Sequence, residues 1–222
     1  MGVSPEALGR HVRMVQRAGY SLMTASDAFQ SASNRAAALT FDDGYADNLE
    51  VAVPLLQSLG ARATIYVVAG EIGRAKPSWY RPAAEHVDRL LTAAELRQLL
   101  QAGWEIGSHC CQHVRLAQLP ESVQREELGR SKAMLEDLLG APVLSLAYPY
   151  GEYSLVTERL AAESGYTHAF STAKRGGSDS AYALKRYSLG GYGLRSVRQL
   201  LKLQWALWQR TGFRRRAGGT GK

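Results

Sequence analysis

Apolar runs of strand length alternate with segments of helical periodicity along almost the whole chain of 222 residues. The runs that predict strands lie at 36–41, 63–68, 104–108, 143–148, 167–172 and 183–189. Apolar residues spaced three and four apart predict helices from Pro5 onward and at about 47–59, 92–102, 121–139, 154–164 and 195–210. This alternation implies parallel strands with helices outside them, in either a barrel or an open sheet.

Capping signals set several of these boundaries. Ser4 followed by Pro5 is typical of an N-cap and a first helical residue, and Thr92 with Glu95 predicts a capping box. Gly60 is expected to end the helix at 47–59. The segment 70–91, with two prolines and two aromatic residues, is expected to form a long loop.

The length fits one domain with a buried core, and we expect a single catalytic domain at 1–212 and a basic disordered tail at 213–222. No uninterrupted apolar run is long enough to span a membrane, and the first residues lack the apolar core of a signal peptide. A cytoplasmic location is therefore expected. The last helix, at about 195–210, has a basic end, which favours a final barrel helix, with contact to an anionic membrane surface as the alternative.

The net charge of +7 is concentrated at the carboxyl terminus. Arg214, Arg215, Arg216 and Lys222 lie among the last nine residues without an acid, and removing these four from the 27 bases leaves 23 against 20 acids. The rest of the chain is only mildly basic and contains no recognisable nucleic-acid module, so no nucleic-acid partner is expected.

Chemically useful residues follow three of the predicted strands. Asp42 and Asp43 come after 36–41, His109 and His113 after 104–108, and Pro149 to Gly151 after 143–148. In barrels and in open parallel sheets, the carboxyl ends of the strands carry the chemistry. The sequence therefore predicts that two acids, two histidines and a tight turn meet at one edge.

These residues predict a catalytic metal site. A helical turn would place His109 and His113, four apart, on one face, and a carboxylate would complete a three-ligand site with open positions, the pattern of catalytic zinc. One of the adjacent acids can bind the ion while the other takes a proton from a water that the ion makes more acidic. Neighbouring residues on an extended backbone point in opposite directions, and Gly44 permits a sharp exit. A capped turn without chemistry is the plainer alternative for "FDDG".

"TFDDG" at 40–44, "SHCCQH" at 108–113 and "YPYG" at 148–151, in this order, resemble the leading motifs of the NodB-type polysaccharide deacetylases, and most closely the exopolysaccharide-type members. The likeness extends through roughly residues 4–192. It implies an α/β fold of the NodB-homology type, a distorted (β/α) barrel in which the ring of strands is either closed or left incomplete. It also implies metal-dependent hydrolysis of N-acetyl groups on the amino sugars of a glycan.

Carried onto matching positions, the resemblance makes Asp42 the base and Asp43, His109 and His113 the metal ligands. Tyr150 belongs to the turn whose backbone N–H holds the oxyanion. The commonest form of the third motif begins with an arginine that holds the catalytic acid, and this position is Ala147 here. Arg186 resembles a late arginine of exopolysaccharide-type members and is expected to form a salt bridge with Asp42 instead.

The general acid is not visible in the motifs. In exopolysaccharide-type relatives, a histidine on a strand before the first helix takes this role, and this chain begins at that helix. We therefore expect a preceding segment or a partner to supply a strand beside 36–41 that carries a histidine, with His86 as the next candidate. Because of Ala147 and the missing acid, a non-catalytic module that binds or assembles glycans is the alternative function.

Three further residue types have plain and functional interpretations. Cys110 and Cys111 are adjacent, so a disulfide between them would be strained, and buried thiols are favoured over zinc ligands. His11 and His168 match no motif and are expected to be ordinary histidines. Trp79 and Tyr80 lie in the long loop, where they either stack on sugar rings or pack the loop against the domain.

Overall fold

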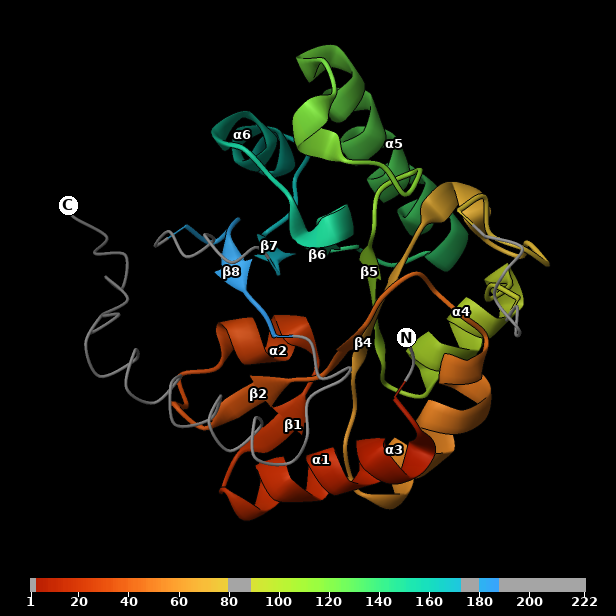
Figure 1. Cartoon of the computed structure of the whole chain (residues 1–222), viewed down its shortest axis with the longest axis vertical. Coiled ribbons are helices and arrows are strands. Elements are labelled where there is room, and N and C mark those ends of the chain that lie inside the picture. Colours follow the sequence, from red (N-terminus) through yellow and green to blue (C-terminus); the bar gives the residue numbers. More distant parts are fainter. Residues whose placement is uncertain (1–2, 80–88, 173–179, 188–222) are drawn as a thin grey trace. The chain divides into compact units, whose positions relative to one another are not determined.

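The computed structural model describes residues 3–79, 89–172 and 180–187. The chain divides into a unit at Ser4–Arg186 and a second one formed by Met1–Val3 and Tyr187–Lys222. All helices and strands of the described residues belong to the first unit (Figure 1). The predicted helix at 195–210, the tail at 213–222 and the domain boundary at 212 lie outside the described residues.

Helices and strands alternate as the sequence predicts. The helices are α1 (Pro5–Arg17), α2 (Ala25–Gln30), α3 (Val53–Ser58), α4 (Ala93–Gln101), α5 (Glu121–Leu139) and α6 (Leu155–Glu163), with short turns η1 (Asn48–Ala52), η2 (Ala69–Glu71), η3 (Leu116–Gln118) and η4 (Pro149–Gly151). The strands are β1 (Ser21–Met23), β2 (Ala36–Ala38), β3 (Thr40–Phe41), β4 (Thr64–Val67), β5 (Glu105–Ser108), β6 (Ser145–Ala147), β7 (His168–Ser171) and β8 (Leu184–Lys185).

Six strands form one parallel sheet in the order β3-β4-β5-β6-β7-β8, so each strand pairs with the next along the chain. This consecutive order is that of a (β/α) barrel. Within the described residues the sheet is curled but not closed. Arg186, directly after β8, forms a salt bridge with Asp42, directly after β3, and thus links the two edges. The expected distorted, incomplete barrel is confirmed as a curled half-barrel (Figure 1).

The two faces of the strands bury different side chains. Ile65 and Val67 of β4 belong to the main apolar core, which also contains leucines of the surrounding helices, such as Leu99 and Leu128. Tyr66, between them, points to the other face and packs with Ala147 in a small inner cluster. Successive side chains of β4 thus alternate between two faces that are both buried. This explains why the sequence of β4 is apolar at nearly every position.

The amino end of the curl is held by Glu105 at the start of β5. Its carboxylate accepts hydrogen bonds from the N–H and hydroxyl of Ser26, from Thr64 and from Ser145, at 2.6–2.9 Å. These bonds connect α2 to three neighbouring strands. The amino end is thus tied together by neutral donors around one carboxylate.

The prediction of one buried strand at 36–41 is wrong. Ala36–Ala38 pair with β1, a strand that the sequence pattern did not reveal, whereas Thr40–Phe41 pair with β4. Both pieces are only partly buried or exposed. The expectation that 36–41 lacks a neighbouring strand is therefore wrong for Ala36–Ala38, while Thr40–Phe41 forms an edge of the six-stranded sheet.

The predicted helix at 47–59 is interrupted near its middle. It consists of a π-helical turn, Asn48–Ala52, followed by α3 at Val53–Ser58. Pro54 lies in the first turn of α3, and proline has no N–H to continue an α-helical ladder. The π-helical turn before Pro54 has a wider hydrogen-bonding pattern, which does not need an N–H from the proline. The helix ends before Gly60, as predicted.

The capping predictions are confirmed. Ser4 accepts a hydrogen bond from the N–H of Ala7, and Thr92 and Glu95 form both halves of the capping box.

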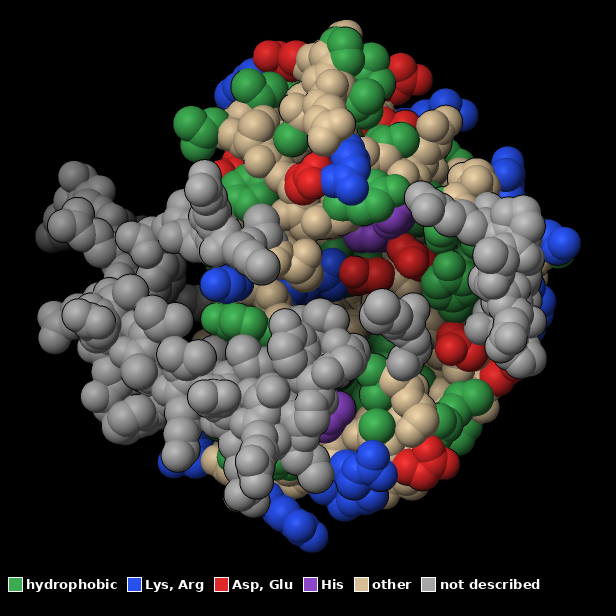
Figure 2. Space-filling view, in the orientation of Figure 1, with side chains coloured by type: hydrophobic (Ala, Val, Ile, Leu, Met, Phe, Trp, Pro, Cys, Tyr) green, Lys and Arg blue, Asp and Glu red, His purple; other side chains and the backbone are tan. Residues whose placement is uncertain are grey.

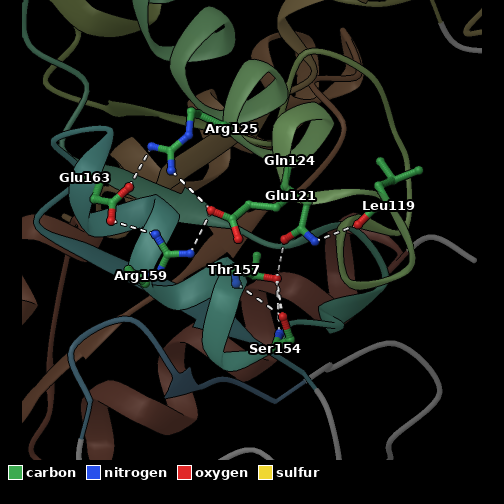
Figure 3. A network of polar contacts seen from close by, with 8 residues as sticks. All are labelled: Leu119, Glu121, Gln124, Arg125, Ser154, Thr157, Arg159 and Glu163. Atoms are coloured by element: carbon green, nitrogen blue, oxygen red, sulfur yellow. Dashed lines mark hydrogen bonds and ion pairs between the residues drawn. The ribbon is translucent and has the colours of Figure 1, made fainter.

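Two exposed acids of α5 and α6 each bind two arginines, as Figure 3 shows. Glu121 and Glu163 both accept from Arg125 and Arg159 at 2.6–3.3 Å. This network fastens α5 to α6.

Candidate active site

The residues singled out in the sequence lie at the carboxyl ends of the strands. Asp42 and Asp43 follow β3, His109 follows β5, and Tyr150 lies in η4 after β6. On the face shown in Figure 2, histidine and acidic side chains adjoin near the centre. The carboxyl edge of the sheet thus gathers the polar side chains that the sequence places after separate strands.

Asp43, His109 and His113 form a compact cluster. Asp43 Oδ1 lies 3.6 Å from His109 Nε2 and 3.5 Å from His113 Nε2, and one donor atom from each residue lies within 4.8 Å of the others. Ligands about 2.0–2.1 Å from a tetrahedral zinc ion stand about 3.3–3.4 Å apart. The donor set and its spacing therefore fit a divalent ion.

The orientation of His109 is fixed by the backbone. Its Nδ1 lies 2.6 Å from the carbonyl oxygen of Ala147. A carbonyl only accepts, so Nδ1 carries the proton and Nε2 keeps a lone pair that faces Asp43. A metal-binding histidine usually has its second nitrogen held in this way, so the arrangement supports the fit of an ion.

Asp42 binds a different partner. The guanidinium of Arg186 donates to both of its carboxylate oxygens, at 2.6 and 2.7 Å, and also to the hydroxyl of Thr40 at 3.1 Å. The expected salt bridge is thus present across the open side of the sheet. Thr40, two residues before Asp42, is a contact of Arg186 that the sequence analysis did not include.

The surroundings push the pKa values of the two acids apart. Burial opposes ionisation of Asp42, but the charge and the hydrogen bonds of Arg186 outweigh burial and hold the pKa of Asp42 below its ordinary value. Burial raises the pKa of Asp43, and the charge of Asp42 raises it further. Adjacent carboxylates with opposite shifts are suited to different tasks.

Both imidazoles are held in the neutral form. Burial lowers the pKa of His109 and of His113, although the charge of Asp42 acts in the opposite direction on each. Only a neutral imidazole can offer a lone pair to a metal ion. The electrostatics of the pair therefore agree with their geometry.

Tyr150 lies in the turn η4, beside the cluster of Asp43, His109 and His113. Its ring centroid is 4.6 Å from that of His113, and 47% of the residue is exposed. The hydrogen bonds of the turn are donated by Gly151 and Glu152 to the carbonyls of Tyr148 and Pro149, so they do not use the N–H of Tyr150.

Trp79 also packs against His113. Its ring centroid lies 4.9 Å from that of His113, and its Nε1 donates to the hydroxyl of Tyr45 at 3.1 Å. Trp79 belongs to the long loop predicted at 70–91, of which 80–88, with Tyr80 and His86, lie outside the described residues. The position of Trp79 beside His113 is compatible with either of its predicted roles.

The expectation that a helical turn brings the two histidines together is wrong. Residues 109–113 are not helical, and Cys110 has a left-handed backbone with φ 67°. Cys110 and Cys111 are both free and buried, and the group of described residues that could hold a metal ion does not include them. The histidines converge because the loop doubles back, and this depends on contacts outside it.

The other described histidines lie away from the site. His168 begins β7, at the amino end of the sheet, and stacks on Phe29 with ring centroids 4.5 Å apart. His11 is buried in α1. Both are ordinary packing histidines, and within the described residues neither stands where a general acid for this site is needed.

A curled half-barrel with an Asp-His-His cluster and an arginine-bound aspartate at its carboxyl edge is the arrangement that the motifs imply. The pattern of the polysaccharide deacetylase family matches residues 30–169, a span that includes the two acids, both histidines and Tyr150. The chain therefore belongs to the polysaccharide deacetylase family. Arg186 lies beyond the matched residues.

Individual relatives agree with this. The chain is 28% identical over 184 residues, 79% of its length, to "Putative polysaccharide deacetylase YxkH" of Bacillus subtilis (strain 168), and spans 61% of that relative. It resembles the Streptococcus pyogenes deacetylase PplD, solved in complex with acetate, with a TM-score of 0.65 at 25% identity over 77% of this chain and 73% of that chain. IcaB from Ammonifex degensii shares the fold, with a TM-score of 0.73 at 19% identity over 91% and 90%.

Among the described residues, no helix is both long and apolar enough to cross a membrane.

Proposed function

We propose that this chain is a metal-dependent hydrolase that removes N-acetyl groups from the amino sugars of a polysaccharide or oligosaccharide. The observation that carries the proposal is the division of the adjacent acids. Asp43 faces two neutral histidines, and Asp42 is bound by Arg186. Family membership supports the same reaction.

Asp43, His109 and His113 would hold the ion, and zinc is the metal that this donor set favours. A divalent ion held there supplies Lewis acidity for the acetamide carbonyl and for a water. Nδ1 of His109 keeps its proton because it donates a hydrogen bond to the carbonyl of Ala147. The lone pair on Nε2 is therefore free to face the ion. His109 therefore requires no change of tautomer to bind the ion.

Asp42 acts as the general base. Its low pKa keeps it ionised at neutral pH, and the bidentate contact with Arg186 fixes the direction of its lone pairs. It takes a proton from the attacking water while the water oxygen bonds to the carbonyl carbon. The C–N bond then breaks as the nitrogen takes a proton from the general acid, which we propose to be the histidine of a preceding strand or a partner, and the products are acetate and a free amine.

The N–H of Tyr150 is proposed to stabilise the oxyanion that forms on the carbonyl. A backbone donor in a fixed turn needs no reorganisation when the charge develops, which is why such donors contribute strongly to catalysis. The rings of Tyr150 and Trp79 both pack against His113 and are proposed to contact a sugar ring. The substrate is therefore proposed to be an N-acetylated glycan, of the kind found in exopolysaccharides.

The experiment is release of acetate from an acetylated chito-oligomer by the purified chain. We expect activity that a chelator abolishes and that added zinc restores. A chain that binds the oligomer without releasing acetate, with or without zinc, would support the alternative, a non-catalytic glycan-binding or assembly module, which Ala147 in place of the usual arginine favours. Membrane contact through the basic helix at 195–210 stays a prediction.

A further inference from the structure

The loop that carries the two histidines has no secondary structure of its own. Residues 109–113 bend back with Cys110 in the left-handed region, φ 67°. A helical turn would bond its backbone internally, but here the polar groups of the loop must find partners elsewhere. The partners of this backbone therefore decide how far apart the two imidazoles stand.

One side of the loop is held by η2. The N–H groups of Ala69 and Gly70 donate to the carbonyls of Cys110 and Cys111, each at 2.9 Å. The approach is close: a Cβ at Gly70 would lie 2.7 Å from the Cys111 oxygen. Two of the three carbonyls between the histidines are thus fixed by the backbone of η2.

The other side of the loop is held by α5. One oxygen of Glu127, Oε2, accepts from the N–H of Cys111 at 3.0 Å and from that of Gln112 at 2.8 Å. The third N–H between the histidines, that of Cys110, donates to the hydroxyl of Ser108 at 3.2 Å. Two of the three N–H groups between the ligands thus depend on one carboxylate.

Glu127 stands on a fixed part of its helix. One turn further along α5, Ser131 lies 3.0 Å from Ser108 through their hydroxyl oxygens, so the same helix face holds both the strand end and the loop. Hydrogen bonds to an ionised acceptor are about twice as strong as neutral ones. The neighbour Glu126 is different: 68% of its side chain is exposed, and its ion pair with Arg130 spans 3.9 Å.

We propose that Glu127 is a positioning residue of the metal centre, which sets the distance between His109 and His113 through the loop backbone. The inference rests on the proposed function, since it assigns Glu127 to the same metal site. It gives α5, which contributes no ligand, a direct influence on metal affinity.

The test is the zinc dissociation constant of the purified chain, measured by competition with a chromophoric chelator well below the melting temperature. Loss of a residue that orients metal ligands costs about 10- to 100-fold in affinity. Because Glu127 acts through the backbone, we expect about a 10-fold weaker constant for Glu127→Ala. Glu127→Gln keeps an oxygen acceptor without the charge, and a smaller effect, about threefold, is expected.

Glu126→Ala is the matched control, since it removes an acid from the adjacent helix position, and its zinc affinity should equal that of the wild type. A merely structural role would lower the melting temperatures of the metal-free and zinc-loaded protein equally and leave the dissociation constant unchanged. If Glu127→Ala does not fold, Glu127→Gln decides. A wild-type constant in the folded variant, or an equal loss in Glu126→Ala, would overturn the inference.

The outcomes separate this inference from the proposed function. A wild-type chain that binds zinc but releases no acetate contradicts the function, while the constants of the variants still support or overturn the role of Glu127. A chain that deacetylates and whose Glu127 variants bind zinc normally contradicts only the inference. A wild-type chain that binds no divalent ion overturns both.

Discussion

Replacement of Arg186 by alanine tests the link between the two edges of the sheet. The side chain of Arg186 is 12% exposed and makes two hydrogen bonds to Asp42, whose side chain is 36% exposed. Removal of one partner from a buried ion pair costs about 3–5 kcal/mol. Since Asp42 is more than a third exposed, water compensates in part, and we expect a loss of about 2 kcal/mol of unfolding free energy.

The stability difference between the wild type and Arg186→Ala should depend on pH. In the wild type, Asp42 has a pKa below its ordinary value, so the pair stabilises the fold above that ordinary value and loses its contribution as pH falls through the folded pKa. The stability difference between wild type and Arg186→Ala should therefore be full at neutral pH and shrink below about pH 4. Without the guanidinium, burial remains and raises the pKa of Asp42.

Two assays follow from this. Denaturant unfolding from about pH 3 to 8, a range that spans the ordinary pKa of an aspartate, gives the stability difference. The pH profile of kcat/KM for acetate release gives the acid limb of the activity, which should move to higher pH in the variant. The metal content must be measured at each pH, because protonation of the ligands also removes activity. Arg186→Lys should be intermediate, since lysine keeps the charge but not the bidentate geometry.

Arg125→Ala is a suitable control, because Arg125 also bonds two acids but lies exposed between α5 and α6 (Figure 3). It should change neither stability nor the pH profile appreciably. An Arg186→Ala variant with wild-type stability and an unshifted acid limb would refute the assignment of Arg186 as the partner that keeps Asp42 ionised.

Three further predictions concern the ligands, the base and the acid. His109→Ala and His113→Ala should each lower the zinc content of dialysed protein, measured by elemental analysis, far below one ion per chain; undiminished stoichiometry would contradict the site. Asp42→Asn should keep zinc and lose about 10² to 10⁴-fold in kcat, whereas Asp43→Asn should lose zinc as well. A longer chain, extended upstream in frame by a strand that carries a histidine, should release acetate faster than this chain; no gain would place the acid elsewhere.

The location of the site residues was predictable because they directly follow strands. A strand of a parallel sheet and the residue directly after it are adjacent in sequence, so Asp43, His109 and Tyr150 could be assigned to one edge from local patterns alone. Arg186 is different. It lies 144 residues from Asp42, and no periodicity connects them; only the resemblance to exopolysaccharide-type members predicted the salt bridge.

The two-stranded sheet of β1 and β2 was not predicted, for an equally physical reason. β1 has three residues, none fully buried, and its partner β2 consists of three alanines. Such short segments show neither alternation nor β-branched side chains, so their pairing is decided by the surrounding fold. The break between β2 and β3 has the same origin, since the two pieces pair with different strands.

The histidine loop shows where local reasoning fails at a functional site. A spacing of four suggested a helix, but the geometry comes from contacts such as those of Glu127, which looks in the sequence like one more acid on a solvated helix face. The only described residues other than glycine with positive φ are Asp43, Cys110 and Tyr150, with φ of 71°, 67° and 59°. Only glycine adopts this conformation without a steric penalty, and each of the three costs on the order of 1–3 kcal/mol. At these three positions, contacts with distant groups outweigh the local backbone preference. The strained positions therefore mark residues whose conformation the site depends on.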